Sequence, residues 1–154
     1  MAKIELLQFP YSTFNEKARW ALDWKRVPHV RTNLLPGPHR ARVSRIAPAS
    51  TTPVLLVDGR AVQGSAAIVA ELERLHPTPP LYPADPALRE RALAIERRYD
   101  GEVGPAARQV LFRVLLGEGA YMCALFSEGH SRAKRALSTA RARRASGAST
   151  RPPP

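Results

Sequence analysis

A short apolar stretch in the middle of the chain constrains the fold most. Residues 51–59 read Thr-Thr-Pro-Val-Leu-Leu-Val-Asp-Gly, so four consecutive apolar residues follow a proline and end at an Asp-Gly turn signal. This pattern predicts a buried strand at 54–57 that turns into a hairpin with a partner strand at 60–62. A proline is tolerated at the first position of a strand, and X–Pro bonds adopt the cis form at low cost, so Thr52–Pro53 is a candidate cis bond.

The segments on both sides of this strand predict a small mixed sheet with covering helices. Ser12 and the pair Gly64–Ser65 each stand where the N-cap of a helix belongs. Trp20 and Trp24 lie one helical turn apart, and we expect the face that carries them to pack on the sheet. The expected elements are strands at 3–9, 29–35, 54–57 and 60–62, and helices at 15–24, 39–46 and 66–75.

A proline-rich segment separates this region from a second, helical one. Residues 77–86 contain five prolines, a composition typical of a stiff extended connector and of a domain boundary. Beyond it, apolar residues at helical spacing predict helices at 87–99, 106–116 and 120–126, with an interruption at 101–105. The predicted organisation is a sheet domain at 1–77, a linker at 78–86, a partial helical domain at 87–128 and a basic tail at 129–154.

The formal charge of +11 is concentrated at the C-terminal end. Residues 129–154 carry seven arginines and lysines and no acidic residue, and Leu137 is their only large apolar residue. Such a segment cannot bury enough surface to offset its chain entropy, so we expect disorder beyond about residue 140. Basic density alone gives salt-sensitive binding to phosphates, which makes a nucleic-acid binder an alternative. The tail has no interleaved aromatic residues, and no nucleic-acid partner is expected.

The remaining composition limits the chemistry and the location. Cys123 is the single cysteine, which excludes an internal disulfide and a Cys-x-x-Cys redox site. The four histidines are scattered without metal-ligand spacing, and no metal is expected. No apolar run approaches the roughly 20 residues that span a bilayer, and the first residues do not resemble a signal peptide. We therefore expect a cytoplasmic protein without a membrane partner.

A stretch near the N-terminus carries a family resemblance. Residues 9–19 read Phe-Pro-Tyr-Ser-Thr-Phe-Asn-Glu-Lys-Ala-Arg, and residues 64–68 read Gly-Ser-Ala-Ala-Ile. With the proline before strand 54–57 and the proline-rich passage into helices, residues 3–128 resemble the glutathione S-transferases. The first stretch is similar to bacterial members with Ser or Cys four residues before a Glu-Lys-x-Arg helix. The resemblance implies an α/β fold: a thioredoxin-like mixed four-stranded sheet with covering helices, followed by a partial all-α domain.

The resemblance also implies a catalytic residue. Ser12 falls at the Ser/Cys position of the family, where a hydroxyl at a helix N-terminus donates to the sulfur of glutathione. Amide donors and the positive end of a helix favour a thiolate, which is the nucleophilic form of a thiol. Asn15 occupies the place of the second cysteine of redox relatives, so disulfide chemistry is not expected.

The implied glutathione-binding residues are Thr52, Pro53, Val54, Gly64 and Ser65. Pro53 matches the cis-proline of the family, and the backbone of Val54 would pair with the cysteinyl backbone of glutathione like an added strand. Ser65 would hold the γ-glutamyl carboxylate at a helix N-terminus. The family usually has Glu or Gln directly before that serine, where this chain has Gly64.

The function implied by the resemblance is transfer of the glutathione thiolate to a small-molecule electrophile. Glutathione would be the co-substrate, no metal would take part, and a homodimer is a possible assembly. In the family the second domain largely supplies the electrophile pocket. Two alternatives stay open: a non-catalytic thioredoxin-like interaction module, and Ser12 and Gly64–Ser65 as plain helix caps.

Overall fold

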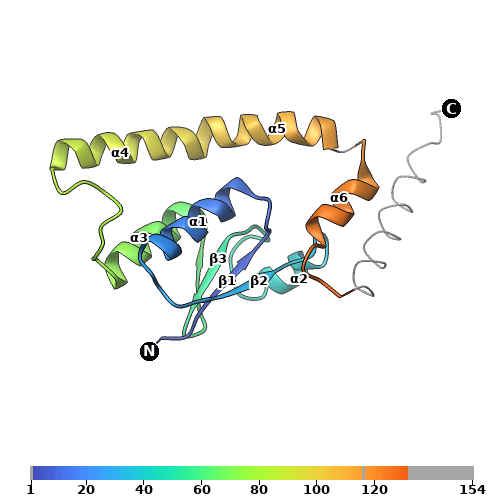
Figure 1. The fold of residues 1–154 in the computed structure, drawn as a ribbon, viewed down its shortest axis with the longest axis horizontal. Helices are drawn as coiled ribbons and strands as arrows, with labels where there is room; N and C mark the ends of the chain where they lie inside the picture. The colour runs from blue at the N-terminus through green and yellow to red at the C-terminus, as the bar shows by residue number, and fades with distance from the viewer. Residues whose placement is uncertain (1, 116, 132–154) are drawn as a thin grey trace. The chain divides into compact units, whose positions relative to one another are not determined.

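A computed structural model describes residues 2–115 and 117–131 (Figure 1). The chain divides into two compact units, of which the first ends at residue 106 and the second begins at residue 107. The strands are β1 (Ile4–Gln8), β2 (Val30–Asn33), β3 (Val54–Val57) and β4 (Arg60–Gln63). The helices are α1 (Thr13–Trp24), α2 (His39–Val43), α3 (Ser65–Leu75), α4 (Pro86–Arg98), α5 (Gly104–Leu115) and α6 (Gly119–Phe126), with a π-helical turn η1 (Tyr99–Val103) between α4 and α5.

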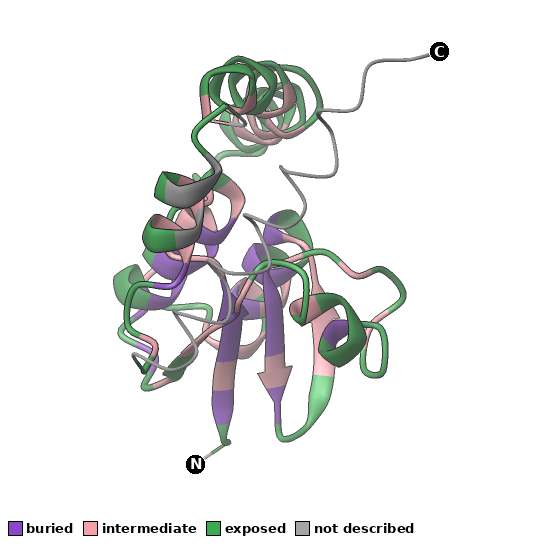
Figure 2. Cartoon of the chain, turned by 90° about the vertical axis from the view of Figure 1, so that its right-hand side faces the viewer, coloured by how far each residue is buried: buried purple, intermediate pink, exposed green. Residues whose placement is uncertain are grey.

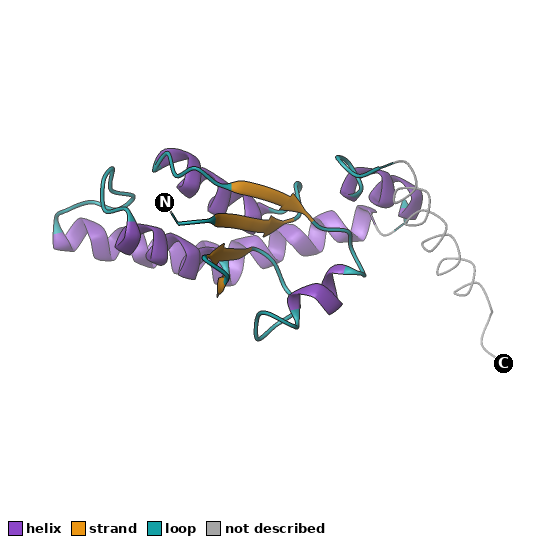
Figure 3. Ribbon diagram, turned by 90° about the horizontal axis from the view of Figure 1, so that it is seen from below, coloured by secondary structure: helices purple, strands orange, loops and turns teal. Residues whose placement is uncertain are grey.

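The four strands form one mixed sheet, drawn in orange in Figure 3, in the order β2-β1-β3-β4. β1 pairs in parallel with β2 and antiparallel with β3, which in turn pairs antiparallel with β4. The predicted strand at 54–57 therefore has a neighbour on each side. Its predicted hairpin with β4 is confirmed, with Asp58 and Gly59 both at positive φ in the turn.

Two apolar clusters lie on the two faces of the sheet, because successive side chains of a strand point to opposite faces. Residues of β1 and β3 such as Leu6 and Leu55 pack with α1 and α3. Their neighbours Leu7 and Val54 pack with α2 through Val43. Figure 2 shows that the buried residues, in purple, concentrate on the strands and the helices that cover them. The predicted fold class of a mixed sheet with covering helices is confirmed.

The linker that leaves α3 is fixed by a buried lysine. Lys25 Nζ lies 2.5 Å from Glu73 Oε1 and donates to the main-chain oxygens of His76 and Pro79, at 2.6 and 2.9 Å. Glu73 also accepts a hydrogen bond from Leu81 N at 2.8 Å. A buried charge is tolerated only when it is paired and hydrogen-bonded. Here Glu73 of α3 supplies the ionic partner, and the chain that follows α3 supplies the hydrogen-bond acceptors.

The predicted packing of the tryptophans on the sheet is wrong. Trp20 and Trp24 are 70% and 59% exposed, whereas Ala18, Ala21 and Leu22 are buried. The small and aliphatic residues of α1 fill the space above the sheet. This leaves the two indoles, on a neighbouring face of the same helix, outside the core.

The second helical region begins at a regular N-cap. Asp85 precedes α4, and its Oδ1 accepts a hydrogen bond from Leu88 N at 2.8 Å, with Pro86 at the first helical position. The predicted interruption at 101–105 is not a break, because η1 continues α4 into α5 with a wider turn. No residue of α4 is buried.

The domain limits at 77, 86 and 128 stay a prediction, and the expected disorder beyond residue 140 lies outside the described residues. Within the described ranges, no helix combines the length and apolar character needed to cross a bilayer.

Replacing Leu22 with alanine tests the assignment of the α1 face to the core. Leu22 is fully buried, so L22A is expected to lower the free energy of unfolding by about 3 kcal/mol, through lost apolar burial and a residual cavity. Urea denaturation measures this change. The matched control is L88A on α4, where the 54% exposed side chain predicts a change below about 0.5 kcal/mol. Equal effects of the two substitutions would contradict the assignment.

Candidate functional site

One row of the sheet fixes the location of the predicted site residues. Leu7, Val54 and Gln63 lie opposite one another on β1, β3 and β4. Ser12 follows the C-terminal end of β1, Thr52 precedes β3, and Ser65 follows β4. The three residues therefore leave the sheet at the same edge, although they are up to 53 positions apart in the sequence.

Ser12 is the N-cap residue of α1 but does not use its hydroxyl as a cap. Its backbone is extended, with φ −107° and ψ 127°, and its side chain makes no capping hydrogen bond. The main-chain oxygen of Ser12 accepts from Glu16 N at 2.8 Å. Within residues 2–115 and 117–131 no hydrogen bond involves Ser12 Oγ. The half-buried hydroxyl is therefore available to a ligand at the positive end of a twelve-residue helix.

Arg19 holds the loop that carries Ser12, and sequence reasoning did not single it out. Its guanidinium is buried and donates to Gln8 Oε1 at 2.7 Å and to the main-chain oxygen of Pro10 at 2.8 Å. It also forms an ion pair with Glu16 in the next turn toward the N-terminus. Since Pro10 stands two residues before Ser12, these contacts fix the path of the chain into α1. The sequence did contain a signal for this role, because an arginine next to the buried face of a predicted helix needs partners if it is buried.

Asn15 connects the first turn of α1 to the residue before Pro53. Its side chain is completely buried, and Nδ2 donates to Thr52 Oγ1 at 3.1 Å. The Thr52–Pro53 peptide bond is cis. Among the described residues the main-chain N–H and C=O of Thr52 have no partner, and Thr52 is partly exposed.

The hydrogen bonding of β3 places Val54 differently from its predicted role. Asp58 N donates to Lys3 O at 2.9 Å, and hydrogen-bonded pairs alternate along an antiparallel ladder, so the same register makes Val54 and Leu7 a hydrogen-bonded pair. The side chain of Val54 is fully buried as well. Its main chain is thus engaged within the sheet, whereas the main chain of Thr52 is open.

The turn into α3 explains the departure at Gly64. Its φ of +93° lies in the region that favours glycine, so a glutamate or glutamine would be strained there. Gly64 N donates to the main-chain oxygen of Pro53 at 3.0 Å, which ties the start of α3 to the residue after Thr52. Ser65, the first residue of α3, is buried, and in the described part of the chain its hydroxyl has no hydrogen-bond partner.

Gln63 does not replace the missing acidic or amide residue. Its Nε2 donates to the main-chain oxygens of Ala49 and Thr51 at 2.6 and 2.8 Å, and its Oε1 accepts from Ala49 N at 3.1 Å. The amide is therefore committed to the loop that leads into Thr52. Gln63 on β4 therefore holds this loop in place. Its amide group is not available to bind a ligand.

Two hollows of the first unit lie elsewhere. One of about 490 Å³ is lined by α3, the linker, α4 and η1, and one of about 680 Å³ by α1, α3, the linker and α4. Neither lining includes Ser12, Thr52 or Ser65. In the ranges that the structure describes, no group of three histidine, cysteine, aspartate or glutamate side chains could hold a metal ion.

The geometry agrees with what comparison with known proteins finds. Residues 6–80 match the family described as glutathione S-transferase, N-terminal domain. Over 91 residues the chain is 35% identical to a probable maleylacetoacetate isomerase of Caenorhabditis elegans, a match that covers 55% of this chain and 42% of that protein.

Two solved structures extend the likeness to the fold. A glutathione S-transferase from Methylobacterium radiotolerans in complex with glutathione sulfonate is 29% identical, with a TM-score of 0.60, over 92% of this chain and 61% of that one. A bacterial maleyl pyruvate isomerase, a zeta-class glutathione S-transferase, is 25% identical, with a TM-score of 0.64, over 80% and 59%. The predicted thioredoxin-like fold is thereby confirmed. The chain spans about half of the length of these relatives, from 42% to 61%.

Replacing Arg19 with methionine tests how the Ser12 loop is held. R19M keeps the apolar stem but leaves Gln8 and the oxygen of Pro10 without their donor, so the free energy of unfolding should fall by about 2 kcal/mol. Thermal and urea denaturation measure it. The control is R26M, because Arg26 is exposed and a change below about 0.5 kcal/mol is expected there. A stability loss in R19M no larger than in R26M would overturn this assignment.

Proposed function

The chain belongs to the glutathione S-transferase family through its N-terminal domain, and on this premise we propose that it binds glutathione and transfers the thiolate to a small-molecule electrophile. One observation carries the proposal. Ser12 lies at the start of α1, at the same edge of the sheet as Thr52 and Ser65, and its hydroxyl makes no capping hydrogen bond. A cap that only stabilised its helix would use that hydroxyl on the helix itself.

Ser12 would act on the sulfur. A thiolate attacks an electrophilic carbon far better than a thiol does, and a hydroxyl donor at a helix N-terminus stabilises the charged form. The thiol proton passes to solvent, a sulfur–carbon bond forms, and the leaving group departs with the electron pair of its bond to that carbon. The protein contributes a lowered thiol pKa and a fixed position for the sulfur.

Thr52 and Ser65 would hold the peptide part of glutathione. The open main-chain N–H and C=O of Thr52 can pair with the cysteinyl main chain, in the manner of an added strand. Ser65, at the start of the eleven-residue α3, offers a hydroxyl and helix N–H groups to the γ-glutamyl carboxylate. The bound glutathione sulfonate of the relative from Methylobacterium radiotolerans supports this choice of ligand.

A second reaction shares the same site. Two relatives are named isomerases, of maleylacetoacetate and of maleyl pyruvate, which favours a glutathione-dependent isomerisation of a cis-alkene acid. The thiolate would add to the double bond, the resulting single bond would rotate, and elimination would release the trans isomer and unchanged glutathione. The two reactions differ in outcome, because conjugation consumes glutathione and isomerisation does not.

Other parts of the functional prediction rest on the same premise. We expect the protein to act in the cytoplasm without a metal, either alone or as a homodimer. Binding to nucleic acid is not expected. The alternative of a non-catalytic interaction module predicts a folded protein without affinity for glutathione.

Replacing Ser12 with alanine tests the role of the hydroxyl. S12A should lower the rate of glutathione conjugation to an activated aryl chloride by about tenfold or more, because one donor to the thiolate is lost. Stopped-flow absorbance at several pH values would also find a raised pKa of the bound thiol. T13A serves as the control, since Thr13 is exposed at the next helical position and its loss should change the rate by less than about twofold. Equal activity of S12A and wild type would refute the role.

Calorimetric titration with glutathione tests the binding site independently of catalysis. Wild-type protein should bind, and S65A should bind about fivefold or more weakly, because a hydrogen bond to a carboxylate is lost. Near-UV absorbance with a cis-alkene acid and catalytic glutathione then separates isomerisation from conjugation. A wild-type protein that releases no heat with millimolar glutathione would favour the interaction module.

A further inference from the structure

One face of α1 contacts the linker, α4 and the turn η1. Phe14, Lys17 and Trp24 are spaced by three and seven positions and therefore share a face of the helix. Lys17 reaches α4 and η1, and Trp24 Nε1 donates to the main-chain oxygen of Pro80 at 3.2 Å. All these residues belong to the first compact unit.

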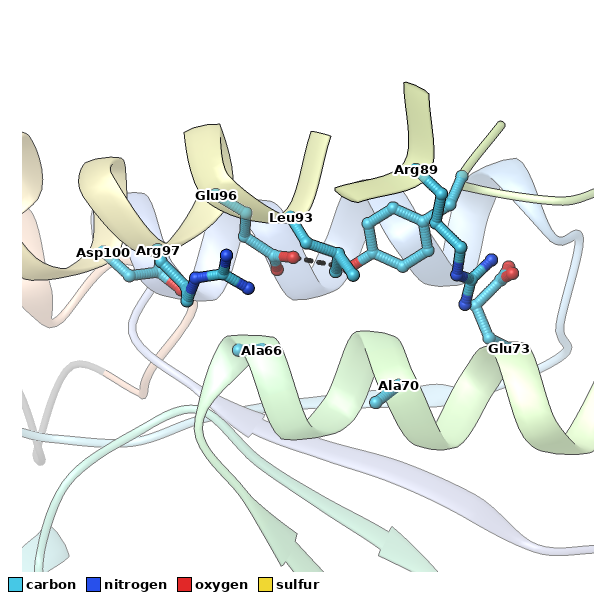
Figure 4. A pocket seen from close by; sticks show the side chains of 9 residues that line it. Ala66, Ala70, Glu73, Arg89, Leu93, Glu96, Arg97 and Asp100 are labelled. Atoms are coloured by element: carbon cyan, nitrogen blue, oxygen red, sulfur yellow. Dashed lines mark hydrogen bonds between the residues drawn. The ribbon is translucent and has the colours of Figure 1, made fainter. Parts of the chain in front are cut away.

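Lys17 is the centre of a charged cluster formed with Tyr82, Glu96 and Asp100. Its Nζ lies 2.6 Å from Glu96 Oε1 as an ion pair and donates a hydrogen bond to Asp100 Oδ2 at 2.7 Å. Tyr82 donates its hydroxyl to Glu96 Oε2 at 2.6 Å, the dashed contact in Figure 4. Burial and the adjacent Glu96 raise the pKa of Tyr82, so its hydroxyl remains a donor at all physiological pH values.

The cluster is partly shielded from water. The side chains of Lys17, Glu96 and Asp100 are 26%, 16% and 27% exposed. Two carboxylates therefore face one ammonium group in a region where charges are only partly solvated. Without the ammonium group the two carboxylates would repel each other, and the segment that carries them would have no attractive contact of this kind with α1.

The segment held by Lys17 approaches α1 closely at Phe14. A Cβ atom on Gly104 would lie 2.9 Å from Phe14 Cζ and 3.0 Å from the main-chain oxygen of Tyr99, so any larger residue at this position would force the Phe14 ring or the local backbone to shift. Phe14 stands two residues after Ser12. Residues 100–104 are therefore placed beside the first turn of the helix at whose start the reactive sulfur is expected.

The same segment contains the π-helical turn. η1 spans Tyr99–Val103 and follows directly on α4. Such turns inside a helix are often found at functional sites. Asp100 belongs to η1, and Glu96 belongs to the preceding turn of α4. Lys17 therefore contacts the chain on both sides of the point where η1 begins.

From these contacts we propose that Lys17 is a positioning residue for the second substrate. It holds the end of α4 and η1 against α1, and residues 100–104 thereby form the side of the site that faces the small electrophile. This inference rests on the proposed glutathione-dependent reaction. It assigns to Lys17 no contact with either substrate.

Four variants test the proposal. K17M removes the ammonium group and keeps an apolar side chain of similar length, and K17R restores a cation in the same place. The matched control is R98M, which breaks the pair of Arg98 with Glu102, both more than 70% exposed, in the same part of the chain. K17M/D100N is a fourth protein, in which one of the two facing carboxylates is neutralised.

The first measurement is amide hydrogen exchange, which needs no activity. In K17M the exchange of residues 96–104 should accelerate by about tenfold or more, because local opening becomes easier. Exchange in the sheet should stay as in wild type. K17R and K17M/D100N should recover part of the protection, and R98M should match wild type. Unchanged exchange of 96–104 in K17M would overturn the proposal.

The second measurement separates the two substrates. K17M should bind glutathione within about twofold of wild type by calorimetry, while the KM for an activated aryl chloride should rise by about tenfold. A parallel loss of glutathione affinity would overturn the positioning role, because Lys17 would then act on the glutathione site. If wild-type protein binds no glutathione, the proposed function fails, and the hydrogen-exchange result still decides whether Lys17 holds residues 96–104.

Discussion

The register of β3 between β1 and β4 is the constraint on which the arrangement of the site depends. Because Leu7, Val54 and Gln63 lie in one row, the ends of three elements meet at one edge of the sheet. A shift of one residue in either ladder would turn the side chains of β3 to the opposite faces and separate these ends. The apolar clusters on the two faces therefore stabilise the fold and also place Ser12, Thr52 and Ser65 together.

Buried polar side chains then fix the loops that the ladders leave undefined. Arg19 holds the entry into α1, Asn15 joins α1 to Thr52, and Lys25 holds the linker after α3. Each of these groups would be costly to bury alone, and each is bound to main-chain or side-chain oxygens of another segment. The same principle, with Lys17, joins the end of α4 to α1. Side chains of α1 and of the lysine that follows it thus supply several of the contacts that hold these segments.

The relation to known transferases is closest where the geometry is most constrained. The family match at residues 6–80 covers the sheet, α1 and α3, whereas the chain spans about half of the length of the relatives compared. Gly64 illustrates how the pattern can change without loss of the turn: its positive φ and its hydrogen bond to Pro53 keep the start of α3 beside Thr52.

The sequence by itself determined the strand at 54–57 with its hairpin, the positions of the helices, and Ser12 at a helix start, because these follow from local periodicity and turn chemistry. The tertiary structure alone decided that Trp20 and Trp24 are exposed. It also decided that the main chain of Val54 is bonded to Leu7 while that of Thr52 is open. The roles of Arg19 and Lys17 in holding the surrounding segments likewise follow only from the tertiary structure. The physical reason is the distance in sequence of the partners. Asn15 and Thr52 are 37 residues apart, and Lys17 and Asp100 are 83 apart, so only the packing of the whole sheet and its helices brings them into contact.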